Sequence, residues 1–598
     1  MSSALPGTAL AQIAPGPGPQ VPSQQVRVLP TRQQVEEPSR ADTAGHRPVV
    51  NVQRLPEPGA CPLTNESIPV ALTRVDFTSA RGGELAPELV HLLSPLQVAP
   101  SGATSIKVVC DIRDRANAAL FRAGYVASVQ IPAQEISDGV LRLSVVAARI
   151  VETRVTGYDG KLPAGIAARV AAIRAMDPLN RHEAERLLLL ANDVPGLTLT
   201  LTLQPAGRDP GEVIATIDVR QQSALVLANF QNSGSRQLGR ELFSVRGEFY
   251  NLTGHADETF IGFSNSAVWK EVHVVQGGHS VGLGTGGVRL GVRASYAESR
   301  PDLTTIDAAG ISVLGPDLRS RSLIAGLDLS TPLLRTLART GQRAFDINIY
   351  AGAGFELINQ RTIIRQNASD IPYTRDRLRV LYGRVGGRFI GRDAFGVTRT
   401  DTEVLVELRK GLSILNATPL GVDGSGFQPS RVEGDPEAFE IRGTINETIR
   451  PLAKFDNLAF DLAIYGQWAN HPLLNLEEFS VGNLTYGRGY DPGANSGDRA
   501  VALRFAPRLR LTGHGSNVQA EATGFFDAVR LWNLDTQSSD RNRLLRSVGG
   551  GLRVSLANRI AAEAIYAHPI DFALSLDTKR PPDRLLFSLT AQLAPWRF

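Results

Sequence analysis

The feature that most constrains the fold is a long series of alternating apolar and polar residues in the last two thirds of the chain. In residues 345–357, Phe, Ile, Ile, Ala, Ala, Phe and Leu occupy every second position, with Asp, Asn, Tyr, Gly or Glu between them. This period of two is typical of a β-strand that has one apolar face. Strands of globular proteins usually have about five or six residues, so this one is long for a soluble sheet.

The alternation continues from about Gln221 to Phe598, and the sequence shows no amphipathic helix there that could cover the apolar face. A soluble half-buried sheet also alternates, but here its apolar face and its edges would be exposed. Closure into a barrel removes the edges and places the apolar face in lipid. We therefore predict an all-β transmembrane barrel over residues 221–598. At about 24 residues for each strand together with its connection, an even number near sixteen of antiparallel strands is expected.

The residues before this barrel divide into three parts. Ala9-Leu10-Ala11 has the small-x-small form of a signal-peptidase site. We expect residues 1–11 to be the remnant of a signal peptide that begins upstream, and a chance match is the alternative. Residues 12–67 are rich in Pro, Gln, Ser and Arg and are predicted to be an extension or linker.

The spacing of apolar residues in 68–220 predicts two similar α+β units in tandem. Each unit, 68–148 and 149–220, has the predicted order strand, helix, helix, strand, strand. A single α+β domain is the alternative. The expected strands are 69–78, 125–131, 140–146, 149–157, 197–204 and 212–219, and the expected helices are 84–93, 105–121, 162–175 and 180–191.

Composition excludes several classes of protein. The sequence contains no run of about 18 apolar residues, which excludes helical membrane spans. The net charge is only +4, and the 63 basic residues are scattered along the chain, so no nucleic-acid surface is expected. Cys61 and Cys110 are expected to form a disulfide in an oxidising compartment, and to be two unrelated thiols in a reducing cytosol.

Sequence motifs for catalysis or cofactor binding are missing. Residues 282–287 satisfy G-x-G-x-x-G, but a strand-like segment comes after them, whereas a dinucleotide site needs a helix N-terminus. We expect a glycine-rich strand there. His182, His273 and His279 lack the spacing of a triad or a metal site, and the sequence has no Walker A, G-x-S-x-G or H-E-x-x-H motif. We predict a protein that is not an enzyme and that needs no nucleotide, metal or other cofactor.

The most informative cluster is Gly487-Arg488-Gly489-Tyr490, in a Gly-, Asn- and Asp-rich stretch that reads as a long loop between strands. About one strand beyond the strand that follows this loop, the alternation points Phe525 and Asp527 into the barrel lumen and Phe526 outward. If the loop folds into the lumen, Arg488 can pair with Asp527. A surface loop with a chance arginine is the alternative.

These residues resemble the two-partner secretion transporters, also called the hemolysin secretion/activation family. They belong to a superfamily of outer-membrane barrels with periplasmic POTRA domains. Residues 487–490 resemble the tetrad of the family's loop 6, and residues 525–527 resemble the strand motif that this arginine engages. Three positions depart from the family pattern: Gly487 replaces Val, Ala528-Val529 replaces Ala-Gly, and Ala148 replaces a Gly between the POTRA domains. Further resemblances lie at 124–125, 131–134, 138–141, 178–179, 185–186, 193–196, 232–235, 239, 251–254 and 257.

The resemblance implies two POTRA domains, at 68–148 and 149–220, and a 16-stranded barrel in the outer membrane. It implies a protein transporter that exports a large β-helical exoprotein with an N-terminal secretion domain. The POTRA domains would bind this cargo, and loop 6 would gate the lumen. Outer-membrane lipid and lipopolysaccharide are the other expected partners. Trp596 and Phe598 are expected to form a C-terminal barrel signal, and the family's N-terminal plug helix is not evident in residues 12–60.

Two other classes of barrel are alternatives. An assembly factor of the same superfamily would insert other barrels, but such proteins usually carry more than two POTRA domains. A passive porin or uptake channel would lack the tandem α+β units.

Overall fold

The computed structural model describes residues 30–36, 50–52, 61, 63, 68–98 and, with short gaps, 103–595. The expected signal-peptide remnant at 1–11 and the C-terminal residues Trp596 and Phe598 lie outside the described residues. The short gaps are 137, 159, 208, 304, 307–311, 314, 342, 421–425, 452–455, 483–484, 514, 537, 539 and 558.

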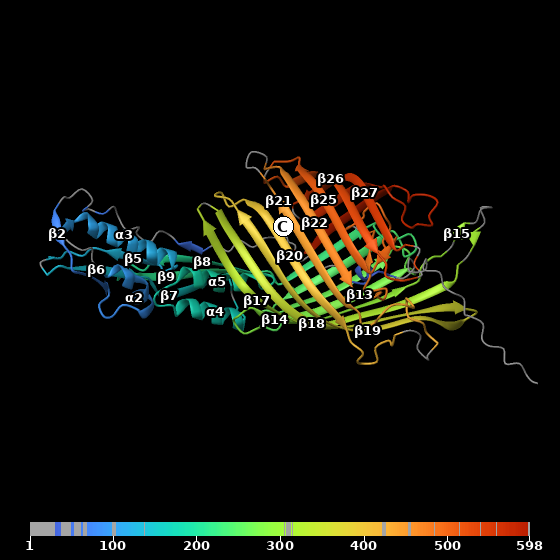
Figure 1. The fold of residues 1–598 in the computed structure, drawn as a ribbon, viewed down its shortest axis with the longest axis horizontal. Coiled ribbons are helices and arrows are strands. Elements are labelled where there is room, and N and C mark those ends of the chain that lie inside the picture. The colour runs from blue at the N-terminus through green and yellow to red at the C-terminus, as the bar shows by residue number, and fades with distance from the viewer. Residues whose placement is uncertain are drawn as a thin grey trace, which may run out of the picture.

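Sixteen antiparallel strands close into a barrel, in which the first strand β10 pairs with the last strand β29. This confirms the predicted barrel and its strand number. Three strands, β17 to β19, have 24 residues each and make the barrel wall uneven in height (Figure 1). The strands are β10 (Ala224–Gln231), β11 (Leu242–Tyr250), β12 (Glu258–Ser266), β13 (Val272–Leu283), β14 (Val288–Ser299), β17 (Asp317–Thr340), β18 (Arg343–Gln366), β19 (Ser369–Arg392), β20 (Thr398–Gly411), β21 (Phe439–Ile449), β22 (Leu458–Ala469), β25 (Arg499–Arg510), β26 (Val518–Trp532), β27 (Asn542–Leu556), β28 (Ile560–Pro569) and β29 (Arg584–Ala594).

The alternation in the sequence becomes two different faces of the barrel wall. On β17, Leu323 and Leu327 are 36% and 49% exposed on the outer face, whereas Ile324 between them is buried toward the lumen. On β18, the lumenal residues Asp346 and Glu356 are buried among other polar groups. Among the described residues, no helix is both long and apolar enough to cross a membrane.

Two α/β units precede the barrel and lie in a row at one end of it (Figure 1). In the first unit, α2 and α3 pack on a three-stranded sheet of order β3-β6-β5. The strand predicted at 69–78 is divided, because its first part pairs with β4 and its second part with β6. The elements are β2 (Pro69–Ala71), β3 (Arg74–Ser79), α2 (Pro87–Leu93), β4 (Ala103–Ser105), α3 (Lys107–Arg122), β5 (Ala127–Gln130) and β6 (Val140–Ala147), with a 3-10 turn at Ser94–Leu96.

In the second unit, α4 and α5 pack on a four-stranded sheet of order β1-β8-β9-β7. Its outermost strand β1 comes from the N-terminal extension and pairs in parallel with β8. The remaining helices and strands lie close to their predicted positions. The elements are β1 (Val50–Val52), β7 (Arg149–Thr156), α4 (Ala164–Arg174), α5 (Arg181–Asn192), β8 (Leu197–Pro205) and β9 (Glu212–Gln221).

The second α/β unit is attached to the rim of the barrel. Arg335 on β17 donates to both carboxylate oxygens of Asp193, which comes directly after α5, at 2.8 and 3.0 Å. Arg339 on the same strand donates to Glu185 of α5 at 2.9 Å. Arg169 of α4 donates to the Thr285 carbonyl oxygen at 2.9 Å.

Thr285 belongs to the glycine-rich run 282–287, which was expected to be a strand. This prediction was wrong for residues 284–287, which form the turn between β13 and β14. Gly284 and Gly287 adopt φ values of +64° and +86°, a conformation that favours glycine.

A short N-terminal segment corrects the prediction that residues 12–67 are only a linker. Residues 30–36 lie inside the barrel and include the four-residue helix α1 (Arg32–Val35). Thr31 and Gln34 form a capping box at its start. Val35 is fully buried and packs with apolar lumenal side chains of the wall, such as Ile324 on β17.

Cys61 and Cys110 form a disulfide, with their Cα atoms 5.9 Å apart. Cys110 lies on the buried face of α3. The bond ties the segment before the first α/β unit to that unit and is remote from the lumen.

Candidate functional site: the lumen and its folded loop

The loop between β22 and β25 folds back into the barrel rather than extending outward. It contains a short two-stranded sheet of β23 (Phe479–Ser480) and β24 (Ser496–Gly497). Phe479, Tyr486 and Tyr490 of the loop pack in one cluster with the lumenal residues Val529 and Leu545 of the wall. We call residues 470–498 loop 6.

The structure brings Arg488 of loop 6 against Asp527 of β26. The Arg488 guanidinium donates to the two carboxylate oxygens at 2.8 and 3.0 Å, and the Arg488 backbone N–H donates at 3.0 Å. The guanidinium also lies 3.7 Å from the centre of the Phe525 ring. Asp527 has no exposed surface and Arg488 is 6% exposed, so this is a buried ion pair with three hydrogen bonds. Phe526 faces outward and is 37% exposed.

Tyr490 anchors the tip of loop 6 to the neighbouring strand β27 and to the loop after β28. Its hydroxyl donates to the Arg546 carbonyl oxygen at 2.8 Å and accepts from the Asp571 backbone N–H at 3.1 Å. Burial raises the pKa of Tyr490 to about 12, so the phenol stays protonated and able to donate at neutral pH.

Glycine is favoured at positions 487 and 489 of the tetrad for two different steric reasons. Gly487 adopts φ +79°, and a Cβ there would lie 2.7 Å from Val481. A valine, which the resemblance leads us to expect at this position, would be strained in this conformation. A Cβ at Gly489 would lie 2.8 Å from the Ser547 Cβ and 3.0 Å from the Pro569 nitrogen, so the loop tip contacts the wall closely.

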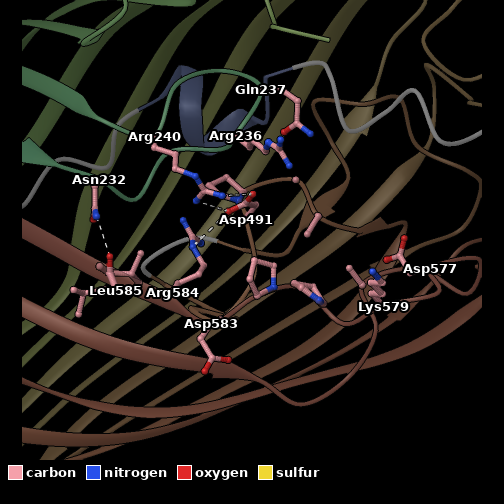
Figure 2. Close-up of a pocket in the computed structure, with 18 residues that line it drawn as sticks. Asn232, Arg236, Gln237, Arg240, Asp491, Asp577, Lys579, Asp583, Arg584 and Leu585 are labelled. Atoms are coloured by element: carbon pink, nitrogen blue, oxygen red, sulfur yellow. Dashed lines mark hydrogen bonds and ion pairs between the residues drawn. The ribbon is translucent and has the colours of Figure 1, made fainter. Parts of the chain in front are cut away.

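A second attachment of loop 6 was not predicted from the sequence. Asp491 accepts from Arg240 at 3.1 and 3.3 Å and lies 3.4 Å from the Arg584 Nε (Figure 2). Arg584, on the last barrel strand, also donates to the carbonyl oxygens of Ser233, Gly234 and Tyr490. Loop 6 is therefore tied to the seam between the first and last strands. A cavity of about 390 Å³ adjoins these residues.

A third attachment joins loop 6 to α1 through charged side chains in the lumen. Arg32 of α1 donates to Glu356 on β18 at 2.8 Å and to Glu477 of loop 6 at 2.7 Å. Arg409 on β20 contacts the same two carboxylates at 2.6 and 2.9 Å. Burial alone would raise the pKa of Glu477, but Arg409, Arg442 and Arg32 hold it below its usual range. Glu477 is therefore a carboxylate at neutral pH.

No local pattern in the sequence could have identified these two attachments. Arg32 lies 324 residues from Glu356 and 445 residues from Glu477 along the chain, and Arg240 lies 251 residues from Asp491. Among the described residues, no group of three or more His, Cys, Asp or Glu side chains is arranged to hold a metal ion.

Comparisons with known proteins agree with this architecture. The model of the family described as haemolysin secretion/activation protein ShlB/FhaC/HecB matches residues 397–554. The match runs from the start of β20 to near the end of β27, so it includes loop 6 with Arg488 and the strand with Asp527.

Curated relatives match over a larger part of the chain. The heme/hemopexin transporter protein HuxB of Haemophilus influenzae (strain 86-028NP) is 23% identical over 483 residues, which are 75% of this chain and 74% of the relative. The outer membrane transporter CdiB of Dickeya dadantii (strain 3937) is 22% identical over 463 residues, with the same two shares.

Two solved structures share the fold. CdiB from Escherichia coli superposes with a TM-score of 0.66 at 17% identity, covering 92% of this chain and 94% of that chain. CdiB from Acinetobacter baumannii gives 0.60 at 16% identity, covering 89% and 91%. This likeness shows that the barrel and the α/β units before it together have the fold of these CdiB structures. Together these matches show that the chain is similar to the haemolysin secretion/activation family in the segment with loop 6 and Asp527, and to the outer membrane transporter CdiB in its overall fold.

Proposed function

We propose that this chain is a two-partner secretion transporter that exports a large β-helical exoprotein, adhesin- or hemolysin-like, through its own lumen. Loop 6 and α1 block the lumen at rest, and the cargo displaces them as it passes. The observation that carries this proposal is the buried pair of Arg488 with Asp527 at the tip of a loop that folds into the barrel.

The burial of this ion pair supports a role in gating. Removing one partner of a buried ion pair typically costs about 3–5 kcal/mol, because the other charge stays buried without compensation. The intact pair therefore holds the loop firmly. A substrate that replaces the loop's contacts one after another can release it without breaking all three attachments at the same time.

We further propose the division into a first POTRA domain at 68–148, a second at 149–220 and the barrel at 221–598. The two POTRA domains receive the N-terminal secretion domain of the cargo. Sheet edges support this role, because an extended segment can add to an open edge as a strand. In the first sheet β3 and β5 are the outer strands, and in the second β7 is outermost on the side opposite β1.

The driving force in this proposal is the folding of the cargo outside the cell. Successive β-helical turns bury apolar surface as they emerge, which opposes return of the chain into the lumen.

An export assay tests this function. Cells would express a genomic neighbour that encodes a long, repeat-rich exoprotein, with and without this chain, and the exoprotein in the medium would be measured. We expect export only with the transporter, and strongly reduced export with Arg488→Ala or Asp527→Ala.

The matched control is Arg508→Ala. Arg508 is also lumenal, but it pairs within the wall with Asp461 and Glu521 rather than with loop 6. Equal export by all three variants, with the barrel inserted normally, would rule out the gating role of the pair. Export of the exoprotein without the transporter would rule out the proposed function itself.

A further inference from the structure

The outer face of the three longest strands changes from apolar to basic toward the end opposite the POTRA domains. On β18, every outward residue from Phe345 to Leu357 is apolar, whereas Arg361 comes a few residues later. On β17, the outward residues Leu327 and Leu323 lie next to Arg321, whose side chain is 69% exposed. The transition therefore occurs on neighbouring strands rather than at one isolated position.

The strand register places these arginines in one row. Arg321 lies directly opposite Arg361, and Arg361 lies directly opposite Arg375 on β19. Residues directly opposite each other in antiparallel strands have Cβ atoms about 4.5–5.5 Å apart, and like charges in such positions are destabilising. The row ends at Glu298 on β14, which is paired with Arg321 at 3.0 Å.

The row lies at the height of lipid head groups. The adjacent row consists of Tyr296, Leu323 and Asn359. It lies two residues along each strand from the row of arginines, on the side of the apolar outer face. Tyr296 is 40% exposed and occupies the place of an aromatic girdle residue, which marks the boundary between hydrocarbon and water. Arg361 lies four residues beyond Leu357, or about 13 Å along a tilted strand, within reach of the head-group layer.

An aromatic ring holds two of the arginines in place. The guanidinium groups of Arg361 and Arg375 lie 5.0 and 4.5 Å from the centre of the Phe427 ring. Phe427 is only 6% exposed, so these side chains cover it. A planar guanidinium held in a fixed orientation can donate two parallel hydrogen bonds to a phosphate group.

We propose that Arg321, Arg361 and Arg375 form a binding site for the phosphorylated head group of a glycolipid in the outer leaflet, of the lipid A class. The phosphates accept hydrogen bonds from this row of guanidinium groups, and the acyl chains lie along the apolar outer face below it, which includes Leu323 and Leu327. The positive charge of the row, and its position just beyond the apolar outer face, favour a phosphorylated glycolipid as the ligand. The site concerns the lipid around the barrel, so it does not depend on the cargo or on gating by loop 6.

Binding of purified lipid A to the full-length protein tests this proposal. The protein would be extracted in a mild detergent, freed of lipid and titrated with diphosphorylated lipid A in native mass spectrometry. Each arginine near an anionic membrane surface contributes about 1 kcal/mol, so Arg321→Gln together with Arg361→Gln should weaken binding roughly thirtyfold.

The matched control is Arg530→Gln on β26. Arg530 also faces outward, but its cross-strand neighbours are Val501 and Leu544 rather than arginines. We expect near wild-type lipid A binding by this variant, and normal heat-modifiable migration of every variant would show that the barrels are folded. Export should be unchanged in the double variant.

Two further titrations test whether the arginines recognise the phosphates of the lipid or free phosphate. Lipid A from which both phosphates have been removed should bind weakly, and inorganic phosphate alone should not compete at millimolar concentration. Equal binding of lipid A by wild type and double variant would overturn the proposal, as would equal binding of the dephosphorylated lipid. Competition by inorganic phosphate would show that the site binds a free anion rather than a lipid, and would also overturn the proposal. If the double variant bound lipid A normally but no longer exported the exoprotein, the arginines would interact with the cargo rather than with lipid.

Discussion

At the scale of single residues, loop 6 is held by contacts that differ in physical kind. Arg488 and Asp527 contribute a buried ion pair, and Tyr490 contributes a hydroxyl that both donates and accepts. Gly489 contributes the absence of a side chain, which lets the loop backbone approach Ser547. Each kind of contact predicts a different response to substitution.

Asp527→Asn tests the ion pair with almost no change in side-chain size. The substitution leaves the Arg488 guanidinium buried without a carboxylate, so we expect a loss of about 3–5 kcal/mol in the free energy of unfolding. Urea titration of the barrel in lipid vesicles would measure it. Asp461→Asn, which affects an ion pair within the wall, should cost less because its partner Arg508 keeps Glu521. A loss under about 1 kcal/mol for Asp527→Asn would contradict the structure of this pair.

Gly489→Ala tests the close approach of the loop tip to the wall. The added methyl group would lie 2.8 Å from the Ser547 Cβ, so the tip must move away from β27 and loosen the hydrogen bonds of Tyr490. We expect a several-fold higher conductance of the closed channel in planar lipid bilayers. Gly513→Ala is the control, because a Cβ there meets nothing within 4 Å. Identical conductance of both variants would show that the tip does not seal the lumen.

At the scale of elements, local periodicity in the sequence is enough to predict most helices and strands, whereas elements placed by long-range contacts escape prediction. The two helices of each α/β unit and the barrel strands have periods that a short window reveals. The helix α1 has only four residues, and its place in the lumen depends on Arg32 meeting carboxylates that are hundreds of residues away. Asp491 likewise lies in a loop with no period, and its partners come from the first loop and the last strand.

Arg32→Gln tests whether α1 contributes to closure of the channel. The substitution removes the contacts of α1 with Glu356 and Glu477, so the segment should leave the lumen more often. We expect more frequent and longer open events in single-channel recordings. Gln33→Ala should not change the recordings, because Gln33 is an exposed residue of the same helix. Unaltered gating in Arg32→Gln would exclude a plugging role for α1.

At the scale of the whole molecule, the second α/β unit and the barrel are joined by charged contacts rather than by a linker alone. Arg335 of the barrel reaches Asp193 beside α5 and also contacts Asp346 within the wall. Such an attachment holds the second α/β unit at the rim of the barrel. The sequence could predict the tandem domains, but not this junction, since neither residue stands out in its own segment.

Asp193→Asn tests this junction. Losing a charge-assisted hydrogen bond of about 1.5 kcal/mol should make local opening of α5 roughly tenfold more frequent. Hydrogen–deuterium exchange of the α5 amides would detect it, while barrel amides should be unchanged. Asp218→Asn on β9 is the control, because Asp218 forms only an exposed pair with Arg220. Equal protection of α5 in the two variants would contradict the proposed anchoring.

Loop 6 is proposed to cover the lumen wall at rest and to leave it while cargo passes, and cysteine labelling tests this movement most directly. Ser547 lies beneath the loop tip and has no exposed surface, and the native cysteines form a disulfide, so Ser547→Cys provides a single buried thiol. Cells would be treated with a membrane-impermeant maleimide, with and without the exported partner, and Ser575→Cys in an outer loop would serve as a labelled reference.

We predict that Ser547→Cys is unlabelled at rest and becomes labelled during export, whereas Ser575→Cys is labelled in both states. Labelling of Ser547→Cys at the same rate without cargo, or none during active export, would contradict the gating role of loop 6.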